Sequence, residues 1–435
     1  MITHELIERI EGEAVIDFTS AKDGTIKDAN IRFIHFRGME AILEERPALD
    51  ALVIAPRVCG ICGHSHLMAA AQMLESVYAN AGMAVSLSAK AQSLREITRL
   101  CELVQNHLKW LYLIMLQESG KLLNETPGSA LKVLYATTQI NQISALFSGQ
   151  WPHSSYALPG GVTSDPTHIE VMQALKLCSD VERFFETELL GCGLERFESI
   201  RSDAELLALQ GDAGECLRRF ERLGLLESGK SHDRFLVLGG HPGCEPVAIV
   251  GGNLEQGDWR DVSEDDSRTF AQGGESYAKN ALYRGEFYET GPLARALAGR
   301  RGMIETLYRR FGDSALTRIG ARIDESVYLL RRIRALIVSM DLSEPSFIVP
   351  EKIESLSGEG IGIVEAPRGT LIHRATLSKG KIASYSIITP TQWNLGNGTA
   401  ESPGVAQKAM IGMKNPAEAS LIFRTFDVCS VCTTH

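Results

Sequence analysis

The chain has 435 residues, of which 44% are hydrophobic and 23% are charged, and its formal net charge is −10. This length and apolar content allow a large buried core and by length alone suggest two or three domains. The acidic balance and the lack of a long Lys/Arg run argue against a nucleic-acid partner. No apolar run of about 18 residues could span a bilayer, and the first residues lack the basic-then-apolar order of a signal peptide. We therefore expect a cytoplasmic chain, or one that reaches a membrane or is exported only through a partner.

The predicted elements change character along the chain. The first forty residues alternate apolar and polar side chains around a turn at Asp23–Gly24, which predicts strands. From about Gly63, apolar residues recur at three- and four-residue steps, which predicts long helices. Residues 225–290 are rich in Gly, Pro and Asp and are expected to form loops and short strands. The remaining expected elements are helices near 292–312 and 315–341 and strands within 369–390, with a turn at Lys379–Gly380.

Long successive helices are typical of a bundle, so the expected fold class is mainly α with smaller β regions (α+β) and a long-helix bundle core. The sequence contains no internal repeat, low-complexity tract or flexible linker. We therefore predict one intertwined unit over residues 1–435. Its parts are a β-rich segment 1–58 followed by the first Cys-x-x-Cys pair, a mostly helical segment 64–342, and a β hairpin with a C-terminal cysteine motif in 360–435.

Two of the cysteine spacings are suited to binding a metal. The chain has nine cysteines, an odd number that argues against a disulfide framework in a chain without a signal peptide. Cys59 and Cys62 lie in "PRVCGICGHSH", and Cys429 and Cys432 lie in "DVCSVCTTH". Four thiolates form a soft ligand set for zinc, iron or nickel. Buried or partly buried thiols in helical stretches are expected for Cys101, Cys178, Cys192 and Cys216, whereas Cys244 lies in a loop and has no predicted role.

The spacing alone leaves a structural four-cysteine zinc site as an alternative. A thioredoxin-like dithiol is disfavoured because neither pair follows the first strand of a βαβ unit. Structural zinc sites close small folds, whereas these two pairs bracket nearly the whole chain and enclose helices that need no metal to form a core. The sequence therefore favours a buried metal site at which the two ends of the chain meet.

The two cysteine motifs resemble the nickel-binding motifs of the large subunit of nickel-iron hydrogenases. Both follow the family patterns, RxCGxCxxxH and DxCxxCxxH. Further similar stretches, in order, are "RIEGE" at 9–13, "FRGMEAILE" at 36–44, "WPHSSYALPGGVT" at 151–163, "YETGPLAR" at 288–295, "EAPRGTLIH" at 365–373 and "TPTQWNLG" at 389–396. The related quinone-site subunit of respiratory complex I lacks these metal-binding cysteines, so the four cysteines argue against that assignment.

The resemblance implies a nickel-iron centre and reversible heterolytic cleavage of H2 into protons and electrons. It implies that Cys59 and Cys429 are terminal nickel ligands. Cys62 and Cys432 would bridge nickel to an iron that also carries carbonyl and cyanide ligands. An H2-sensing subunit is the alternative within the family, since a chain that ends at the motif without an extension is one mark of such sensors.

The resemblance also implies roles for residues around the metals. Glu11 would exchange protons with Cys429, and the nearby Glu8 and Glu13 are competing candidates. Arg368, Pro390 and Thr391 would contact the cyanide ligands of the iron, because a guanidinium fork and a hydroxyl donate hydrogen bonds to anions. Asp427 would pair with Arg368 and hold it in place. His66, the last residue of the first motif, would lie just outside the metal ligands.

A partner subunit and a magnesium site are implied as well. Glu40, the backbone carbonyl of Ile387 and His435 would bind Mg2+, since a carboxylate, a carbonyl and an imidazole with waters can form an octahedral shell. No further cysteines have iron–sulfur spacing, so we expect no cluster in this chain. Electrons would pass to an iron–sulfur small subunit through a large, mostly apolar interface in a heterodimer, with further electron-transfer subunits beyond it.

The sequence departs from the family pattern at two places. Val428 replaces the usual proline after Asp427, which restores a backbone N–H before Cys429. Asn106–His107 stands where many relatives have an Asp-His pair, so one charged neighbour of Arg368 is expected to be missing.

Overall fold

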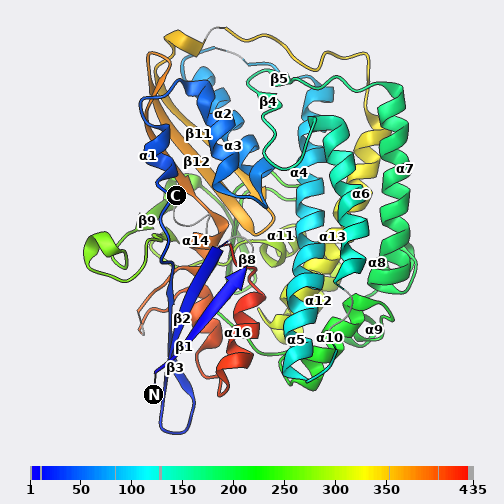
Figure 1. The fold of residues 1–435 in the computed structure, drawn as a ribbon, viewed down its shortest axis with the longest axis vertical. Coiled ribbons are helices and arrows are strands. Elements are labelled where there is room, and N and C mark those ends of the chain that lie inside the picture. Colours follow the sequence, from blue (N-terminus) through cyan, green and yellow to red (C-terminus); the bar gives the residue numbers. More distant parts are fainter. Residues whose placement is uncertain are drawn as a thin grey trace.

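The structure, a computed structural model, describes residues 2–9, 12–83, 85–126, 130–351, 353–399 and 401–429. Helices predominate, accompanied by small antiparallel sheets (Figure 1), which confirms the predicted fold class. No helix among the described residues is long and apolar enough to cross a membrane.

The N-terminal strands form a three-stranded antiparallel sheet in the order β1-β2-β3. The strands are β1 (Ile2–Arg9), β2 (Gly12–Ser20) and β3 (Ile26–Arg32). The predicted turn at Asp23–Gly24 joins β2 to β3, and Gly24 has a φ of 86°, which glycine adopts without steric cost. The short helices α1 (Met39–Leu43) and α2 (Ala51–Ile54) lead from this sheet to the first cysteine pair.

A bundle of long helices that pack side by side forms the right-hand half of the molecule in Figure 1. Its members are α4 (Ala89–Trp110), α6 (Leu131–Ser148), α7 (His168–Phe184) and α13 (Ala315–Ser339). Ser88, Thr167 and Ser314 cap three of these helices with side-chain oxygens that accept backbone N–H groups, which explains where they begin. Helix α4 passes through a π-helical segment, Leu111–Met115, into α5 (Leu116–Leu122).

Shorter elements surround the bundle. The helices of the middle segment are α8 (Leu194–Glu198), α9 (Asp203–Leu207), α10 (Asp212–Arg222), α11 (Pro292–Ala298) and α12 (Gly302–Phe311). Its strands are β4 (Ala157–Leu158), β5 (Gly161–Val162), β6 (Arg234–Val237), β7 (Val247–Val250), β8 (Asn253–Gln256), β9 (Val262–Asp265) and β10 (Asn280–Tyr283). The loops and short strands predicted for residues 225–290 are thus present.

The part of the fold that positions the cysteines is a sheet with one helix laid across it. Strands β11 (Gly358–Ala366), β12 (Gly369–Ser378) and β13 (Lys381–Ile388) form an antiparallel sheet, with the predicted turn at Lys379–Gly380. Helix α3 (Gly63–Asn80) packs against β11 and β12 (Figure 1). The chain then continues through α14 (Pro390–Leu395), α15 (Val405–Met410) and α16 (Pro416–Arg424) to the last described residue, Cys429.

One prediction about the cysteines was wrong. Cys101, Cys178 and Cys216 are buried in helices as expected. Cys192 is partly buried, as expected, but lies in a turn rather than in a helix, after Gly191, whose φ of 70° ends the preceding helical segment. The apolar spacing before this glycine resembled that of the preceding helix, which explains the error.

Candidate metal centre

The structure brings the two cysteine motifs together inside the molecule. Cys59 follows a 3₁₀ turn, Ala55–Val58, and Cys62 is the residue immediately before α3. The Cys59 and Cys429 sulfurs lie 3.6 Å apart, although 370 positions separate them in the sequence. Cys59, Cys62 and Cys429 are buried and, with Ile61, form an apolar cluster of their own. The prediction that the two ends of the chain meet is confirmed for these three cysteines.

The sulfur of Cys59 is held by the backbone of its own loop. The N–H groups of Ile61 and Cys62 donate to it at 3.4 and 3.2 Å. The hydrogen bond with Cys59 and burial together raise the pKa of the Cys62 thiol well above its usual value. Without a cation the Cys62 sulfur therefore stays protonated, and a bound metal would supply the positive charge that favours the thiolate.

Arg368 and Asp427 form the predicted ion pair beside the cysteines. Arg368 lies at the turn between β11 and β12, and its Nε is 3.1 Å from both the backbone oxygen and Oδ2 of Asp427. A second arginine, Arg322 of α13, donates to the same Asp427 Oδ2 at 3.1 Å and lies over the Trp110 ring. Two arginines therefore share one buried carboxylate, which leaves net positive charge next to the cysteine cluster.

Helix α14 approaches the Arg368 turn. Asn394 donates through Nδ2 to the backbone oxygens of Arg368 and Thr290, which fixes α14 against this turn. Pro390 and Thr391 form the first turn of α14, and both are buried. The Thr391 hydroxyl has no hydrogen-bond partner among the residues that the structure describes. A buried hydroxyl without a partner is costly, so a further acceptor at this position fits the site.

Glu40 and Ile387, two residues of the predicted magnesium site, are neighbours in the structure. The backbone N–H of Ile387 donates to Glu40 Oε1 at 2.8 Å, so the strand β13 and the helix α1 meet there. The Lys279 Nζ lies 3.9 Å from Glu40 Oε2. A carboxylate held against a strand end beside a cation is compatible with a partly hydrated Mg2+, although Lys279 would share the carboxylate.

His66 lies one turn into α3, where its N–H donates to the Cys62 carbonyl oxygen at 3.2 Å. Its Nδ1 is 2.9 Å from His373 Nε2, and His373 Nδ1 is 2.7 Å from the Tyr385 hydroxyl. Burial raises the pKa of Tyr385 above its usual value, so this hydroxyl keeps its proton. The ring of His66 is thus oriented by a row of buried hydrogen bonds.

Several predicted site residues lie outside the described part of the chain. These are Glu11, Cys432 and His435. The backbones of Glu8 and Glu13 pair directly across β1 and β2, but their side chains are not described. The choice among the three candidate glutamates stays a prediction.

The sequence analysis did not predict a buried network of charged residues that contacts the backbone next to Arg368. Arg295 makes a two-point ion pair with Glu325 at 2.6 and 2.7 Å and a third contact with Glu365 at 3.2 Å. His107 Nε2 is 2.7 Å from Glu325 Oε2, and burial lowers the pKa of His107 to about 4. Arg295 also donates to the carbonyls of Ala366 and Pro367, so the network supports the backbone that carries Arg368.

Asn106 is buried, and its position as a neighbour of Arg368 stays a prediction. A second missed residue is Glu102 of α4. It is buried and accepts hydrogen bonds from the first turn of α3, and burial raises its pKa to about 7. The sequence could have identified Glu102, because a charged residue stands here at a position where the apolar spacing of α4 predicts burial.

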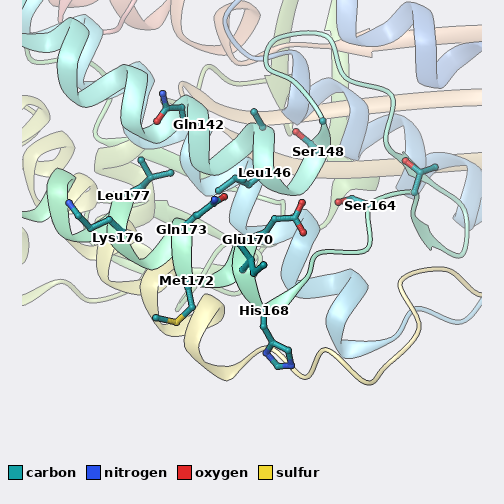
Figure 2. A pocket seen from close by; sticks show the side chains of 14 residues that line it. Gln142, Leu146, Ser148, Ser164, His168, Glu170, Met172, Gln173, Lys176 and Leu177 are labelled. Carbon is teal, nitrogen blue, oxygen red and sulfur yellow. The ribbon is translucent and has the colours of Figure 1, made fainter.

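A groove far from these residues carries no predicted function. It has a volume of about 1170 Å³ and lies along the outer faces of α6 and α7, lined by side chains that include Gln142, Leu146, Met172 and Lys176 (Figure 2). None of the predicted site residues lines it.

The fold and the cysteine pairs define a metalloprotein built around a buried thiolate site between the two ends of the chain. The family model of nickel-dependent hydrogenases matches residues 37–116 and 256–435. The chain therefore belongs to the nickel-dependent hydrogenase family. This confirms the predicted class of enzyme, an oxidoreductase that acts on H2, with this chain as its catalytic large subunit.

Similar proteins extend along the whole chain. One chain of the F420-non-reducing hydrogenase of Methanothermobacter marburgensis is 26% identical over 100% of this chain and 94% of its own length. The large subunit of the periplasmic NiFeSe hydrogenase of Desulfomicrobium baculatum is 22% identical over the same shares. The Ni-Fe-Se hydrogenase of Desulfovibrio vulgaris Hildenborough in its reduced state superimposes with a TM-score of 0.84 at 21% identity, covering 100% of both chains, which shows a shared fold.

Proposed function

We propose that this chain cleaves H2 reversibly and heterolytically at a nickel-iron centre held by Cys59, Cys62, Cys429 and Cys432. The observation that carries the proposal is the 3.6 Å separation of the Cys59 and Cys429 sulfurs in a buried, apolar cluster. Two sulfurs from opposite ends of the chain at this distance suit a shared soft metal ion. When bound, the nickel-iron pair acts as the Lewis acid that polarises H2 and takes up its electrons.

The hydrogen bonds to sulfur support different roles for the first two cysteines. Cys59 accepts two backbone N–H groups, which suits a terminal ligand because part of its lone-pair density is already used. No N–H donor to Cys62 is found among the described residues, which suits a sulfur that binds two metals. We assign Cys59 and Cys429 as terminal nickel ligands and Cys62 and Cys432 as bridges to iron.

Arg368, Pro390 and Thr391 would surround the carbonyl and cyanide ligands of the iron. Arg368 supplies positive charge that is held in place by Asp427, which also pairs with Arg322, and the Thr391 hydroxyl supplies a donor that lacks an acceptor among the described residues. A preorganised donor and charge in a dry pocket stabilise anionic groups strongly. His66 would contact the centre from the first turn of α3.

The proton set free from H2 needs an acceptor close to the metals. We assign this role to Glu11, which would exchange protons with Cys429, and keep Glu8 and Glu13 as alternatives. Glu11→Gln preserves the shape of the side chain but cannot take up a proton at ordinary pH. We expect this variant to keep its nickel while exchange between D2 and water protons falls by orders of magnitude. Exchange at the wild-type rate would assign the proton to another residue.

Glu40, the Ile387 carbonyl and His435 would bind Mg2+ next to the centre. Electrons would leave through an iron–sulfur small subunit, since the cysteines outside the two pairs are widely spaced. Apolar side chains exposed near the first cysteine pair, Phe36, Ile42 and Val53, support a docking surface for this subunit there. The partner subunit and any further electron-transfer subunits would determine where in the cell the complex is located.

One experiment tests the metal centre directly. The chain is purified with its partner, and its metals are measured together with its infrared spectrum in the carbonyl and cyanide region. We expect nickel and iron in equal amounts and bands from bound carbonyl and cyanide. Zinc alone without these bands would overturn the proposal.

A further inference from the structure

The first turn of α3 has an unusual cap. Cys62 occupies the N-cap position, and its side chain makes no capping hydrogen bond. The side chain of an N-cap residue ordinarily accepts the N–H of the second or third helical residue, because these groups have no partner within the helix. In α3 these residues are His64 and Ser65.

Both N–H groups are taken by a carboxylate from another helix. Glu102 of α4 accepts the His64 N–H through Oε2 at 2.8 Å and the Ser65 N–H through Oε1 at 2.9 Å. The Ser65 hydroxyl donates to the same Oε1 at 2.6 Å. Glu102 is 1% exposed, so these bonds form without competition from solvent. In its ionised form the carboxylate also suits the positive end of the helix.

We propose that Glu102 is a positioning residue for the metal centre: it caps α3 in place of Cys62, and so keeps the Cys62 sulfur available to metal. The inference rests on the proposed role of Cys62 as a metal ligand. The contrast with Cys59 supports it, because the Cys59 sulfur accepts N–H groups from Ile61 and Cys62, whereas the described residues provide none to the Cys62 sulfur. A sulfur at an N-cap would otherwise be the nearest acceptor for the first turn of its own helix.

The decisive variant is Glu102→Gln in the complex purified with its partner. Gln keeps the size of the side chain but replaces one acceptor oxygen with a donor NH2 group, so one of the two N–H groups loses its acceptor. The Cys62 sulfur then turns toward that N–H. We expect the nickel content per chain to fall about tenfold, the factor that corresponds to one redirected hydrogen bond to a charged group.

Glu75→Gln is the matched control. Glu75 lies on α3 and pairs with Arg95 at 2.8 Å, so its replacement removes a carboxylate from this helix without touching the first turn. Thermal unfolding and nickel content are measured for both variants. Nickel loss in Glu102→Gln at a thermal stability close to that of Glu75→Gln supports the inference. Wild-type nickel content in Glu102→Gln, or equal nickel loss in both variants, overturns it.

If Glu102→Gln does not accumulate as folded protein, Glu102→Asp decides. Asp keeps the carboxylate but is one methylene group shorter, so it cannot accept both the His64 and the Ser65 N–H groups at the distances that Glu102 reaches. Nickel content below that of Glu75→Gln supports the inference, and wild-type content overturns it. Metal analysis and the infrared spectrum of the wild-type complex separate the two proposals. Zinc without carbonyl and cyanide bands in the wild type overturns the proposed function. A normal nickel-iron centre in the wild type, together with wild-type nickel content in the variants, overturns only the role of Glu102.

Discussion

Gly362 on β11 faces the backbone of α3, which packs on the sheet beside the turn that carries Arg368, and leaves no room there for a side chain. A Cβ at this position would lie 1.9 Å from the Ala69 backbone oxygen and 2.6 Å from the Met73 nitrogen, whereas ordinary contact begins at 3.4 Å. Because both obstacles are backbone atoms of α3, Gly362→Ala must push the helix away from the sheet by about 1.5 Å, the difference between 3.4 and 1.9 Å. Inserting atoms into a packed core costs typically about 1–3 kcal/mol, and this rigid contact places the variant at the upper end.

The displacement would reach the metal centre, since α3 begins directly after Cys62. A shift of about 1 Å in a reacting group can reduce the rate about 100-fold. We expect Gly362→Ala to lower the Tm by about 3 °C, because a cost of about 3 kcal/mol is divided by an unfolding entropy of about 0.9 kcal/mol/K for 435 residues, and to lower H2 oxidation by about 100-fold. Differential scanning calorimetry and a dye-linked H2 oxidation assay measure the two effects.

Gly302→Ala is the control for this experiment, because a Cβ at Gly302 meets no atom within 4 Å. We expect Tm and turnover in the control to equal those of the wild type. A Gly362→Ala enzyme with unchanged Tm and turnover would show that α3 does not rest on this glycine and would refute the reasoning.

Three further predictions test the surroundings of the centre. Cys59→Ser should abolish nickel binding, whereas Cys178→Ser should retain it; equal loss by metal analysis would indicate a folding effect. Arg368→Lys keeps the charge but loses the guanidinium fork that contacts Asp427, so turnover should fall by about tenfold or more at near-normal nickel content, and unchanged turnover would remove Arg368 from the site. Burial lowers the pKa of His107 from 6.5 to about 4, so the unfolded chain binds this proton first as the pH falls. The free energy of unfolding should therefore drop by about 2 kcal/mol between pH 7 and pH 5 through this group, and denaturant titration of His107→Gln should show a smaller drop.

The elements that could be predicted from the sequence are those with a strong local pattern. Three- and four-residue apolar spacing identified the long helices, and the Asp23–Gly24 and Lys379–Gly380 turns identified two hairpins. Cys192 was placed in a helix because the apolar spacing of the preceding stretch obscured the effect of Gly191, which ends that helical segment. Local patterns therefore located the helices better than their ends.

The residues of the candidate site also fall into two groups, those that a local sequence pattern located and those that it did not. The motifs located Cys59, Arg368 and Asp427, because each lies in a short stretch with a distinctive order of residues. Arg322 and Glu102 were missed, since they lie on helices α13 and α4 and reach the site only where these helices pass it. Periodicity shows which face of a helix is buried, but not which other element that face contacts, so contacts between distant segments require the structure.

The backbone conformation of Asp427 explains the effect of having Val428 in place of the usual proline. Asp427 has a φ of 65°, in the left-handed region that Asp tolerates better than most residues. A proline at 428 would push the preceding residue toward extended backbone, whereas valine places no such restriction on it. In this conformation the Asp427 carboxylate lies 3.1 Å from both Arg322 and Arg368. Val428 thus allows one carboxylate, two residues before Cys429, to hold two arginines from separate parts of the fold.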